Sequence, residues 1–364
     1  MSALETINFT RGVPATESFP IADLAQSAAT ALAANGADAL LQYGPAAGLA
    51  ALRTWLAEWQ GVKPEQVLTG NGSLELVEFL CTAMLKPGDV VFTEAPSYDR
   101  AITLFRRHGA NVIGVPLEAD GPDLAALERL LAQHKPKLFY VIPDFQNPSG
   151  ATCSTAKRKR LVELAEQHDL LLLEDAPYRL LRYRGTQEPT LFSLAPQRTL
   201  HMTSFTKLIA PGVRLGFMIG DAAMLAKIGK VAEDTYISPG YFAHGVTCEW
   251  LKAGKLLPQI EKLKSLYAPR LAACLAALDK HIPDAVATRP DGGFFLSLTL
   301  PAGVSTTDLR AAAARHNLNL ADGLAFFPSG GGERFLRLPF CALTPAQIDE
   351  GVRRLAIAIR EVRK

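Results

Sequence analysis

The sequence predicts an α/β protein with a large, doubly wound, mainly parallel sheet domain and a smaller α+β domain built from both termini. Between residues 69 and 219, short runs that are apolar throughout alternate with amphipathic stretches. Such runs are typical of parallel strands covered by helices on both faces. The sequence pattern changes beyond residue 278, where the predicted strands and helices no longer form this regular alternation. We expect residues 36–262 in the large domain, and residues 1–35 and 263–364 in the small one.

The pattern of apolar residues places the individual elements. We expect strands at 89–93, 111–115, 138–142, 170–173, 199–204 and 216–219. Helices are expected between them at 74–85, 99–108, 123–133 and 155–168, followed by a helix-rich stretch over 237–278. In the small domain, strands are expected near 292–300 and 334–340, with helices starting at 307 and 345. We expect the first 35 residues to pack on this small domain.

Composition excludes several classes of function. The 364 residues include 38 Lys and Arg against 36 Asp and Glu, so the net charge of +2 gives no reason to expect nucleic acid or an anionic membrane as a partner. The five cysteines have no metal-binding or redox spacing and are odd in number, which predicts reduced thiols and a cytoplasmic protein. Neither a signal peptide nor a membrane span is expected. The seven scattered histidines predict no metal site.

Polar residues follow the predicted strands at the points where the strands end. Asp175 follows the run at 170–173, Asn147 follows the run at 138–142, and Lys207 follows the run at 199–204. Because the carboxyl ends of parallel strands share one edge of a sheet, we expect these side chains to meet in one crevice.

These residue types suit one cofactor. The helix start at Ser73 offers free N–H groups to a phosphate. Ser204, Thr206 and Arg214 would add hydroxyls and a permanent cation. Lys207 beside that cation would lose its proton more easily and could form an imine, while Asp175 could keep a ring nitrogen protonated. A charged pyridine ring joined to a lysine imine is pyridoxal phosphate.

Each residue alone has an ordinary interpretation, and only the combination favours the cofactor. A lysine near Ser and Thr is usually a surface charge, and an Asp after a strand is usually a helix cap. Tyr98 alone would be a core or rim aromatic, and Asn147 before proline would be a turn. The incomplete glycine pattern at 70–75 does not predict nicotinamide binding.

The motifs carry a family resemblance from about residue 7 to residue 360. They are YGPAAGL at 43–49, NGSL at 71–74, EAPSY at 94–98, QNPSG at 146–150, EDAPY at 174–178, SFTK at 204–207 with Arg214, PDGGF at 290–294 and FLRL at 335–338. In this order they resemble the fold-type I, pyridoxal-phosphate-dependent aminotransferases of class I and II, and most of all the 2-aminoadipate (kynurenine) branch. This resemblance is specific for the cofactor and much less so for the substrate.

The resemblance implies a role for each matching residue. Lys207 would hold the cofactor covalently and move the proton at the substrate Cα, Asp175 would pair with the ring nitrogen, and Tyr178 with Asn147 would contact the ring oxygen O3′. The other residues implied in cofactor binding are Tyr98 against the ring, and Gly72, Ser73, Leu74, Ser204, Thr206 and Arg214 around the phosphate. Tyr43 would reach the phosphate of a neighbouring subunit, which implies a homodimer with shared active sites. Arg337, assisted by Asn147, would bind the substrate α-carboxylate.

The chain departs from the family pattern near its start. The usual AGGxP segment reads TRGVP at 10–14, so that Arg11 stands beside Gly12 at the expected substrate site. We hypothesise that Arg11 contacts an acidic substrate side chain, although a surface salt bridge is the plainer interpretation. Leu74 and Glu75 replace the usual glutamines, which leaves only the backbone contact at 74.

Three functions are compatible with these residues to different degrees. The first is transfer of an α-amino group between an amino acid and a 2-oxo acid, with glutamate and 2-oxoglutarate as the default pair. The second is another reaction of the same cofactor at Cα, such as that of a decarboxylase, a lyase or a biosynthetic cyclase or oxidase. The third is a regulator with an aminotransferase-like domain. This function is not favoured, because the sequence leaves no room for a DNA-reading domain before the family motifs begin.

Overall fold

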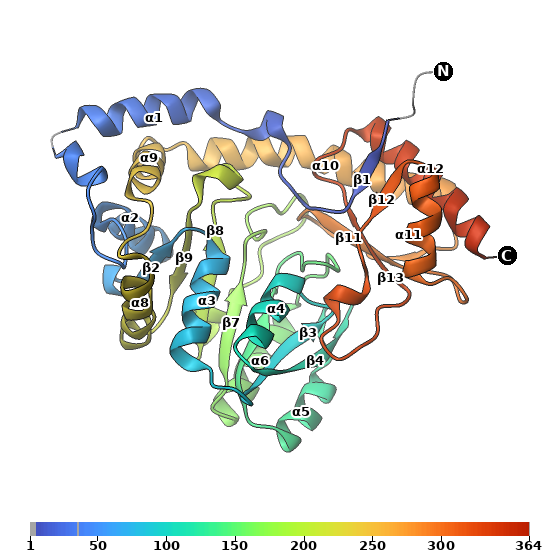
Figure 1. The fold of residues 1–364 in the computed structure, drawn as a ribbon, viewed down its shortest axis with the longest axis horizontal. Helices are drawn as coiled ribbons and strands as arrows, with labels where there is room; N and C mark the ends of the chain where they lie inside the picture. Colours follow the sequence, from blue (N-terminus) through green and yellow to red (C-terminus); the bar gives the residue numbers. More distant parts are fainter. Residues whose placement is uncertain (1–4, 35, 364) are drawn as a thin grey trace.

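The computed structural model describes residues 5–34 and 36–363 and is built around an eight-stranded sheet (Figure 1). The strands run in the order β2-β9-β8-β7-β6-β3-β4-β5. Their bounds are β2 Val67–Gly70, β3 Val90–Ala95, β4 Asn111–Glu118, β5 Gly121–Pro122, β6 Pro136–Val141, β7 Leu171–Asp175, β8 Thr199–Ser204 and β9 Gly216–Ile219. The run β4-β3-β6-β7-β8 is parallel, whereas β2, β9 and β5 pair antiparallel. The predicted mainly parallel sheet is confirmed.

Helices cover both faces of this sheet. Leu76 of α3, Phe105 of α4 and Ile228 of α8 join one core cluster with the sheet, and Leu131 of α5 and Leu161 of α6 join another. The helices of the large part are α2 Ala50–Gln60, α3 Ser73–Met84, α4 Asp99–Arg107, α5 Leu124–Gln133, α6 Thr155–Gln167, α7 Leu191–Leu194, α8 Ala222–Tyr236 and α9 Tyr241–Lys252. The sheet is therefore doubly wound, as expected from strands that are apolar along their whole length.

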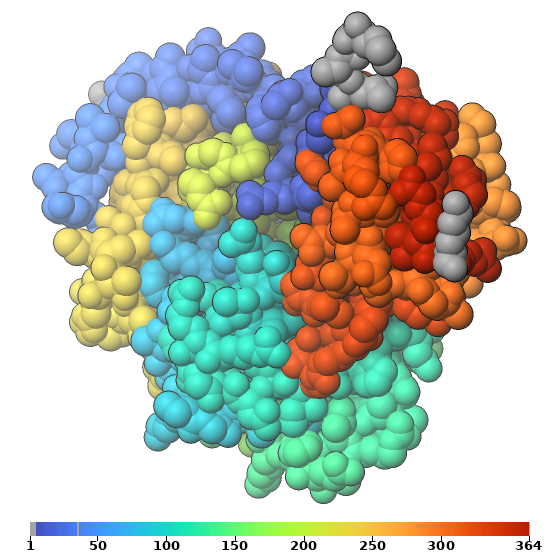
Figure 2. Space-filling view, turned by 45° about the vertical axis from the view of Figure 1, so that its right-hand side comes forward, coloured from blue at the N-terminus to red at the C-terminus, as the bar shows by residue number. Residues whose placement is uncertain are grey.

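A smaller α+β part is formed mainly by the C-terminal third of the chain (orange and red in Figures 1 and 2). It contains the antiparallel sheet β10-β11-β13 and the parallel pair β1-β12. The bounds are β1 Ile7–Phe9, α10 Leu256–His281, β10 Val286–Ala287, β11 Phe295–Thr299, α11 Thr306–Arg315, β12 Leu318–Leu320, β13 Phe335–Pro339 and α12 Pro345–Val362.

The N-terminal segment is divided between the two parts. Strand β1 pairs with β12, but helix α1 (Ile21–Ala33) lies against α9 of the large part (Figure 1). The expectation that the first 35 residues pack together on the small domain therefore holds only for the strand; residues 1–4 and 35 lie outside the described part. Short 3-10 turns complete the fold at Thr16–Ser18, Ala37–Leu40, Pro64–Gln66, Pro211–Val213 and Leu324–Phe326.

All five cysteines are free and buried. Across the described residues, no helix combines the length and the apolar character that a membrane crossing requires.

Candidate active site

The residues that follow the parallel strands meet at one edge of the sheet. Tyr98 follows β3, Asn147 follows β6, Asp175 ends β7 and Lys207 follows β8. Because these strands are parallel neighbours, their carboxyl ends lie side by side, which is where doubly wound sheets bind ligands. The N-terminal segment reaches the same edge, since the Gly12 carbonyl accepts a hydrogen bond of 3.1 Å from Lys207 Nζ.

Asp175 is a buried carboxylate with one oxygen free. Its Oδ2 accepts a hydrogen bond of 2.6 Å from the Tyr140 hydroxyl, and its Oδ1 is buried without a hydrogen-bond partner in the described part of the chain. Burial raises the pKa of Asp175 to about 6, while the Tyr140 hydrogen bond opposes that rise. A buried oxygen of this kind calls for a donor, and a protonated ring nitrogen would provide one.

Lys207 has the environment of a reactive amine. Burial lowers the pKa of Lys207, and the nearby Arg337 acts in the same direction, whereas Cys341 and Asp175 raise it. The ammonium also lies 5.7 Å from the centre of the Phe294 ring. A lysine whose pKa is lowered by burial can form an imine with an aldehyde more readily than a solvated one.

A cradle of polar groups is formed at the start of α3. The helix begins at Ser73, directly after Gly72, which has φ 101°. The N–H groups of its first turn have no acceptor within the helix and can bind an anion. Arg214 lies over this turn and donates from Nη2 to the Asn71 carbonyl. Ser204, at the end of β8, contributes a hydroxyl whose Oγ lies 2.7 Å from Thr206 Oγ1.

Close approach of two backbones shapes the cradle. A Cβ added to Gly216 would lie 2.4 Å from the Ser73 nitrogen, and one added to Gly72 would lie 2.5 Å from Arg214 Nη2. Glycine at these positions lets β9 and Arg214 reach the helix start. The Glu75 carboxylate accepts from the Asn71 N–H at 2.7 Å, so this departure from the family pattern anchors the turn.

The Arg337 guanidinium is held in place at the edge of the site. Its Nη1 donates to Asn147 Oδ1 at 2.9 Å and its Nη2 donates to the Thr10 carbonyl at 2.6 Å. The guanidinium carbon lies 4.8 Å from the Phe295 ring centre and 4.6 Å from that of Phe326. The buried Arg337 Nε has no partner in the described structure. Arg337 and Asn147 are thus brought together as the sequence predicted.

The remaining candidates divide into two groups. Tyr178 is buried against Phe294 and Phe295, with ring centres 5.6 and 5.7 Å apart, and Tyr98 is partly buried at the same edge. Tyr43 is instead 72% exposed and makes no side-chain hydrogen bond in the described structure. Arg11 is also exposed, so neither Tyr43 nor Arg11 is enclosed by the site within one chain.

Sequence reasoning missed three residues that touch the site. Tyr140 binds Asp175, Phe326 stacks on Arg337, and the Cys341 thiol donates to the Val13 carbonyl at 3.1 Å near Lys207. Each belongs to an apolar run of the sequence, and such a run predicts a buried core segment and not a functional site. The signal that could have found Tyr140 is its hydroxyl, since a buried phenol needs a partner.

The residues together fit a phosphorylated pyridine aldehyde. The free Asp175 oxygen suits a ring N–H, Lys207 suits an aldehyde, and the helix start with Arg214 suits a phosphate. Within the described residues, no group of three or more His, Cys, Asp or Glu side chains is arranged to hold a metal ion.

Comparisons with known proteins agree with this site. The family described as aminotransferase class I and II matches residues 5–355. A 2-aminoadipate transaminase of Thermus thermophilus is 37% identical, covering 97% of this chain and 90% of that protein. An aromatic-amino-acid aminotransferase of Thermococcus litoralis is 32% identical, covering 99% of this chain and 89% of that protein. The crystal structure of an α-aminoadipate aminotransferase from Thermus thermophilus, complexed with N-(5′-phosphopyridoxyl)-L-leucine, has a TM-score of 0.94 and 36% identity over 98% of this chain and 93% of that one.

Proposed function

The chain belongs to the class I and II aminotransferases and is an enzyme that transfers amino groups, and we propose that it does so with pyridoxal 5′-phosphate held by Lys207. The observation that carries this proposal is the buried Asp175 oxygen without a partner, in a carboxylate close enough to Lys207 for the two charges to interact. The family and the phosphopyridoxyl group in the similar structure imply the same cofactor.

When bound, the cofactor supplies an electron sink for negative charge that develops at the substrate Cα. Asp175 would keep the ring nitrogen protonated, and Asn147 and Tyr178 would hold the ring oxygen. The Lys207 amine, whose pKa is lowered by burial, would take the proton from the substrate Cα and deliver it two atoms away, at the carbon that was the aldehyde of the cofactor. Arg337 binds the substrate α-carboxylate, a contact worth about 1.5–3 kcal/mol.

We propose glutamate and 2-oxoglutarate as one substrate pair, with an acidic side chain recognised by Arg11. Thr10 and Gly12 contact Arg337 and Lys207 through their carbonyl groups, so Arg11 stands between two residues of the site. Its guanidinium is exposed and is therefore accessible to a substrate carboxylate. The names of the similar proteins include both acidic and aromatic substrates.

We also propose a homodimer in which Tyr43 completes the phosphate site of the partner. Tyr43, Leu41, Ile237 and Phe242 are all exposed, at 72%, 72%, 52% and 44%. The two segments that carry them are joined, because the Tyr236 and Tyr241 hydroxyls, beside Ile237 and Phe242, donate to the carbonyls of Ala46 and Pro45. A second copy would cover this apolar surface.

Titration with pyridoxal phosphate tests the central proposal. We expect a visible absorbance band, trapping of the cofactor on Lys207 by borohydride as seen by peptide mass, and loss of the band when glutamate is added. Lys207→Ala should lose the trapped adduct and all transfer, while Lys264→Ala, which removes an exposed ion pair with Glu261, should keep both. A wild-type protein that binds no pyridoxal phosphate would overturn the proposal.

The other reactions of the same cofactor at Cα are not favoured, because the similar proteins named above are aminotransferases. A product assay separates the two possibilities. Transfer yields glutamate from 2-oxoglutarate with no loss of carbon dioxide, whereas a decarboxylase or lyase would release a fragment of the amino acid.

A further inference from the structure

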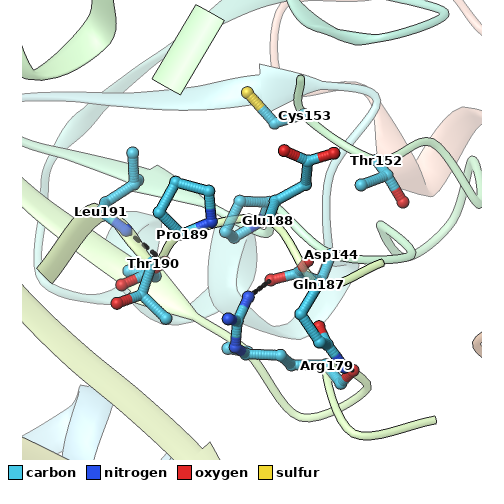
Figure 3. Close-up of polar contacts among 12 residues, drawn as sticks. Asp144, Thr152, Cys153, Arg179, Gln187, Glu188, Pro189, Thr190 and Leu191 are labelled. Atoms are coloured by element: carbon cyan, nitrogen blue, oxygen red, sulfur yellow. Dashed lines mark hydrogen bonds and ion pairs between the residues drawn. The ribbon is translucent and has the colours of Figure 1, made fainter. Parts of the chain in front are cut away.

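A buried ion cluster connects the two segments that carry Asn147 and Tyr178. Asp144, three residues before Asn147, is completely buried and accepts from two arginines, one of which, Arg179, is labelled beside it in Figure 3. Arg158 of α6 donates to it from Nη2 at 2.8 Å and from Nη1 at 3.3 Å. Arg179, the residue next to Tyr178, donates to it from Nη1 at 3.2 Å.

Arg158 fixes the segment at 143–153. Its five N–H groups make five hydrogen bonds: two to Asp144 and one each to the carbonyls of Pro143, Cys153 and Pro189. Every donor is used in a side chain that is itself fully buried. The loop that presents Asn147 is therefore closed at both of its ends by one guanidinium.

Arg179 ties the second segment to the first. Its side chain is 20% exposed and reaches Asp144, while its carbonyl accepts from Gln187 Nε2 at 2.7 Å (Figure 3). The Pro189 carbonyl at the far end of this segment is bound by Arg158. The segment at 178–190 is thus attached to Asp144 and Arg158 at two points, one of them next to Tyr178.

We propose that Asp144, with Arg158 and Arg179, is a positioning cluster that fixes Asn147 relative to Tyr178 so that both can donate to the same oxygen of the cofactor. This inference rests on the proposed function. The two donors come from different strands, and hydrogen-bond strength falls steeply with misalignment. Asp144 belongs to the loop that carries Asn147, and its carboxylate binds Arg179, the neighbour of Tyr178. This contact therefore restrains the separation of Asn147 and Tyr178.

Arg179→Met is the most informative variant, because it cuts the link to the Tyr178 segment and leaves the buried Arg158–Asp144 pair intact. Asp144→Asn would leave Arg158 with a buried charge and less compensation, so folding itself could fail. Arg179→Lys keeps a cation that can reach Asp144. Arg184→Met is the matched control, since Arg184 lies in the same segment but pairs with Asp291 and is 59% exposed.

Two measurements besides activity report on the cofactor oxygen. Asn147 and Tyr178 stabilise its anionic form, so weaker contacts should raise the pH midpoint of the visible band of the cofactor-loaded protein, by about half a unit. The dissociation constant for pyridoxal phosphate should rise by about fivefold, as expected for one weakened hydrogen bond. Arg179→Lys should recover most of both changes, and Arg184→Met should show neither.

The outcomes separate the inference from the function on which it rests. A wild-type protein that binds no pyridoxal phosphate would overturn the proposed function. A wild-type protein that binds it, with an Arg179→Met variant of unchanged midpoint and affinity, would overturn the positioning cluster alone. The positioning cluster would also be overturned if Arg184→Met shifted the pH midpoint as much as Arg179→Met does. Thermal unfolding of each variant without cofactor, expected within a few degrees of wild type, shows that the fold is retained.

Discussion

Tyr140 and Asp175 are joined across neighbouring strands by a hydrogen bond of 2.6 Å, which occupies one oxygen of a buried carboxylate whose other oxygen has no partner in the described structure. The phenol thereby orients the carboxylate and stabilises its charged form. Because Tyr140 is itself completely buried, neither group can exchange this contact for water.

Removal of this hydroxyl should disturb Asp175 directly. In Tyr140→Phe the pKa of Asp175 should rise further above about 6, because the hydrogen bond that opposes the effect of burial is lost. A bond to a charged group corresponds to about one pKa unit or more. We expect the acidic limb of the pH profile for kcat to move to higher pH by about one unit, with a loss of kcat of about twofold at pH 7 and approaching tenfold below pH 6.

Tyr183→Phe is the control for this experiment. It removes another tyrosine hydroxyl that donates to a backbone carbonyl, that of Gly293 at 2.6 Å, away from Asp175. An equal shift of the pH profile in both variants would show that Tyr140 acts through general packing and not through the carboxylate.

Arg337→Lys should weaken binding of both substrates. Lysine cannot form the bidentate pair with a carboxylate, nor stack as a plane between Phe295 and Phe326. We expect KM for glutamate and for 2-oxoglutarate to rise by about 10- to 100-fold, with cofactor affinity unchanged. Arg334→Lys, near the start of the same strand and exposed, serves as the control. Unchanged KM values would assign the α-carboxylate to another group.

Arg11→Ala should reduce the preference for acidic substrates. An exposed ion pair contributes about 0.2–1 kcal/mol, so kcat/KM for glutamate relative to leucine should fall by about two- to fivefold. Arg11→Lys keeps the charge and should retain most of the preference. If the ratio is the same in wild type and Arg11→Ala, Arg11 has no part in substrate choice.

Glu94→Gln should change how stability depends on pH. Burial raises the pKa of Glu94 to about 8, opposed by hydrogen bonds from the Ile142 N–H and the Gln146 side chain. A raised pKa means that the carboxyl contributes its full stability below about pH 4.5 and loses it as the pH rises through about 8. We expect the free energy of unfolding of wild type to fall relative to Glu94→Gln between about pH 5 and 8, by up to a few kcal/mol in urea titrations. If the difference in free energy of unfolding between wild type and Glu94→Gln does not change with pH, this expectation is wrong.

The edge where the site forms could be predicted from the sequence because it depends only on strand direction. Asp175, Asn147 and Lys207 each follow an apolar run, and parallel strands place such residues together whatever their register. The contact of Tyr140 with Asp175 could not be predicted in this way. This contact requires that β6 and β7 be neighbours and that Tyr140 pair with Leu173. The residues of a single strand determine neither the strand order nor the register.

Two other features lie beyond the reach of a single sequence for different reasons. Helix α1 packs on α9 because Pro20 and the preceding turn lead the chain away from β1, a path that periodicity does not specify. The Tyr43 side chain is largely exposed and has no hydrogen-bond partner among the residues that the structure describes. The role that we propose for Tyr43 depends on a second copy, so an argument from one chain cannot place it.

The N-terminal segment meets Lys207 and Arg337 with main-chain oxygens only, those of Gly12 and Thr10. These contacts do not depend on which side chains stand at positions 10 and 11, whereas at 12 a Cβ would strike the Phe295 ring at 2.2 Å. Saturation libraries at 10 and 11 can therefore vary the side chains beside Lys207 and Arg337 without removing either contact, and glycine at 12 should be kept fixed. Deletion of the whole segment would be a poor way to widen specificity, because it would take both acceptors away.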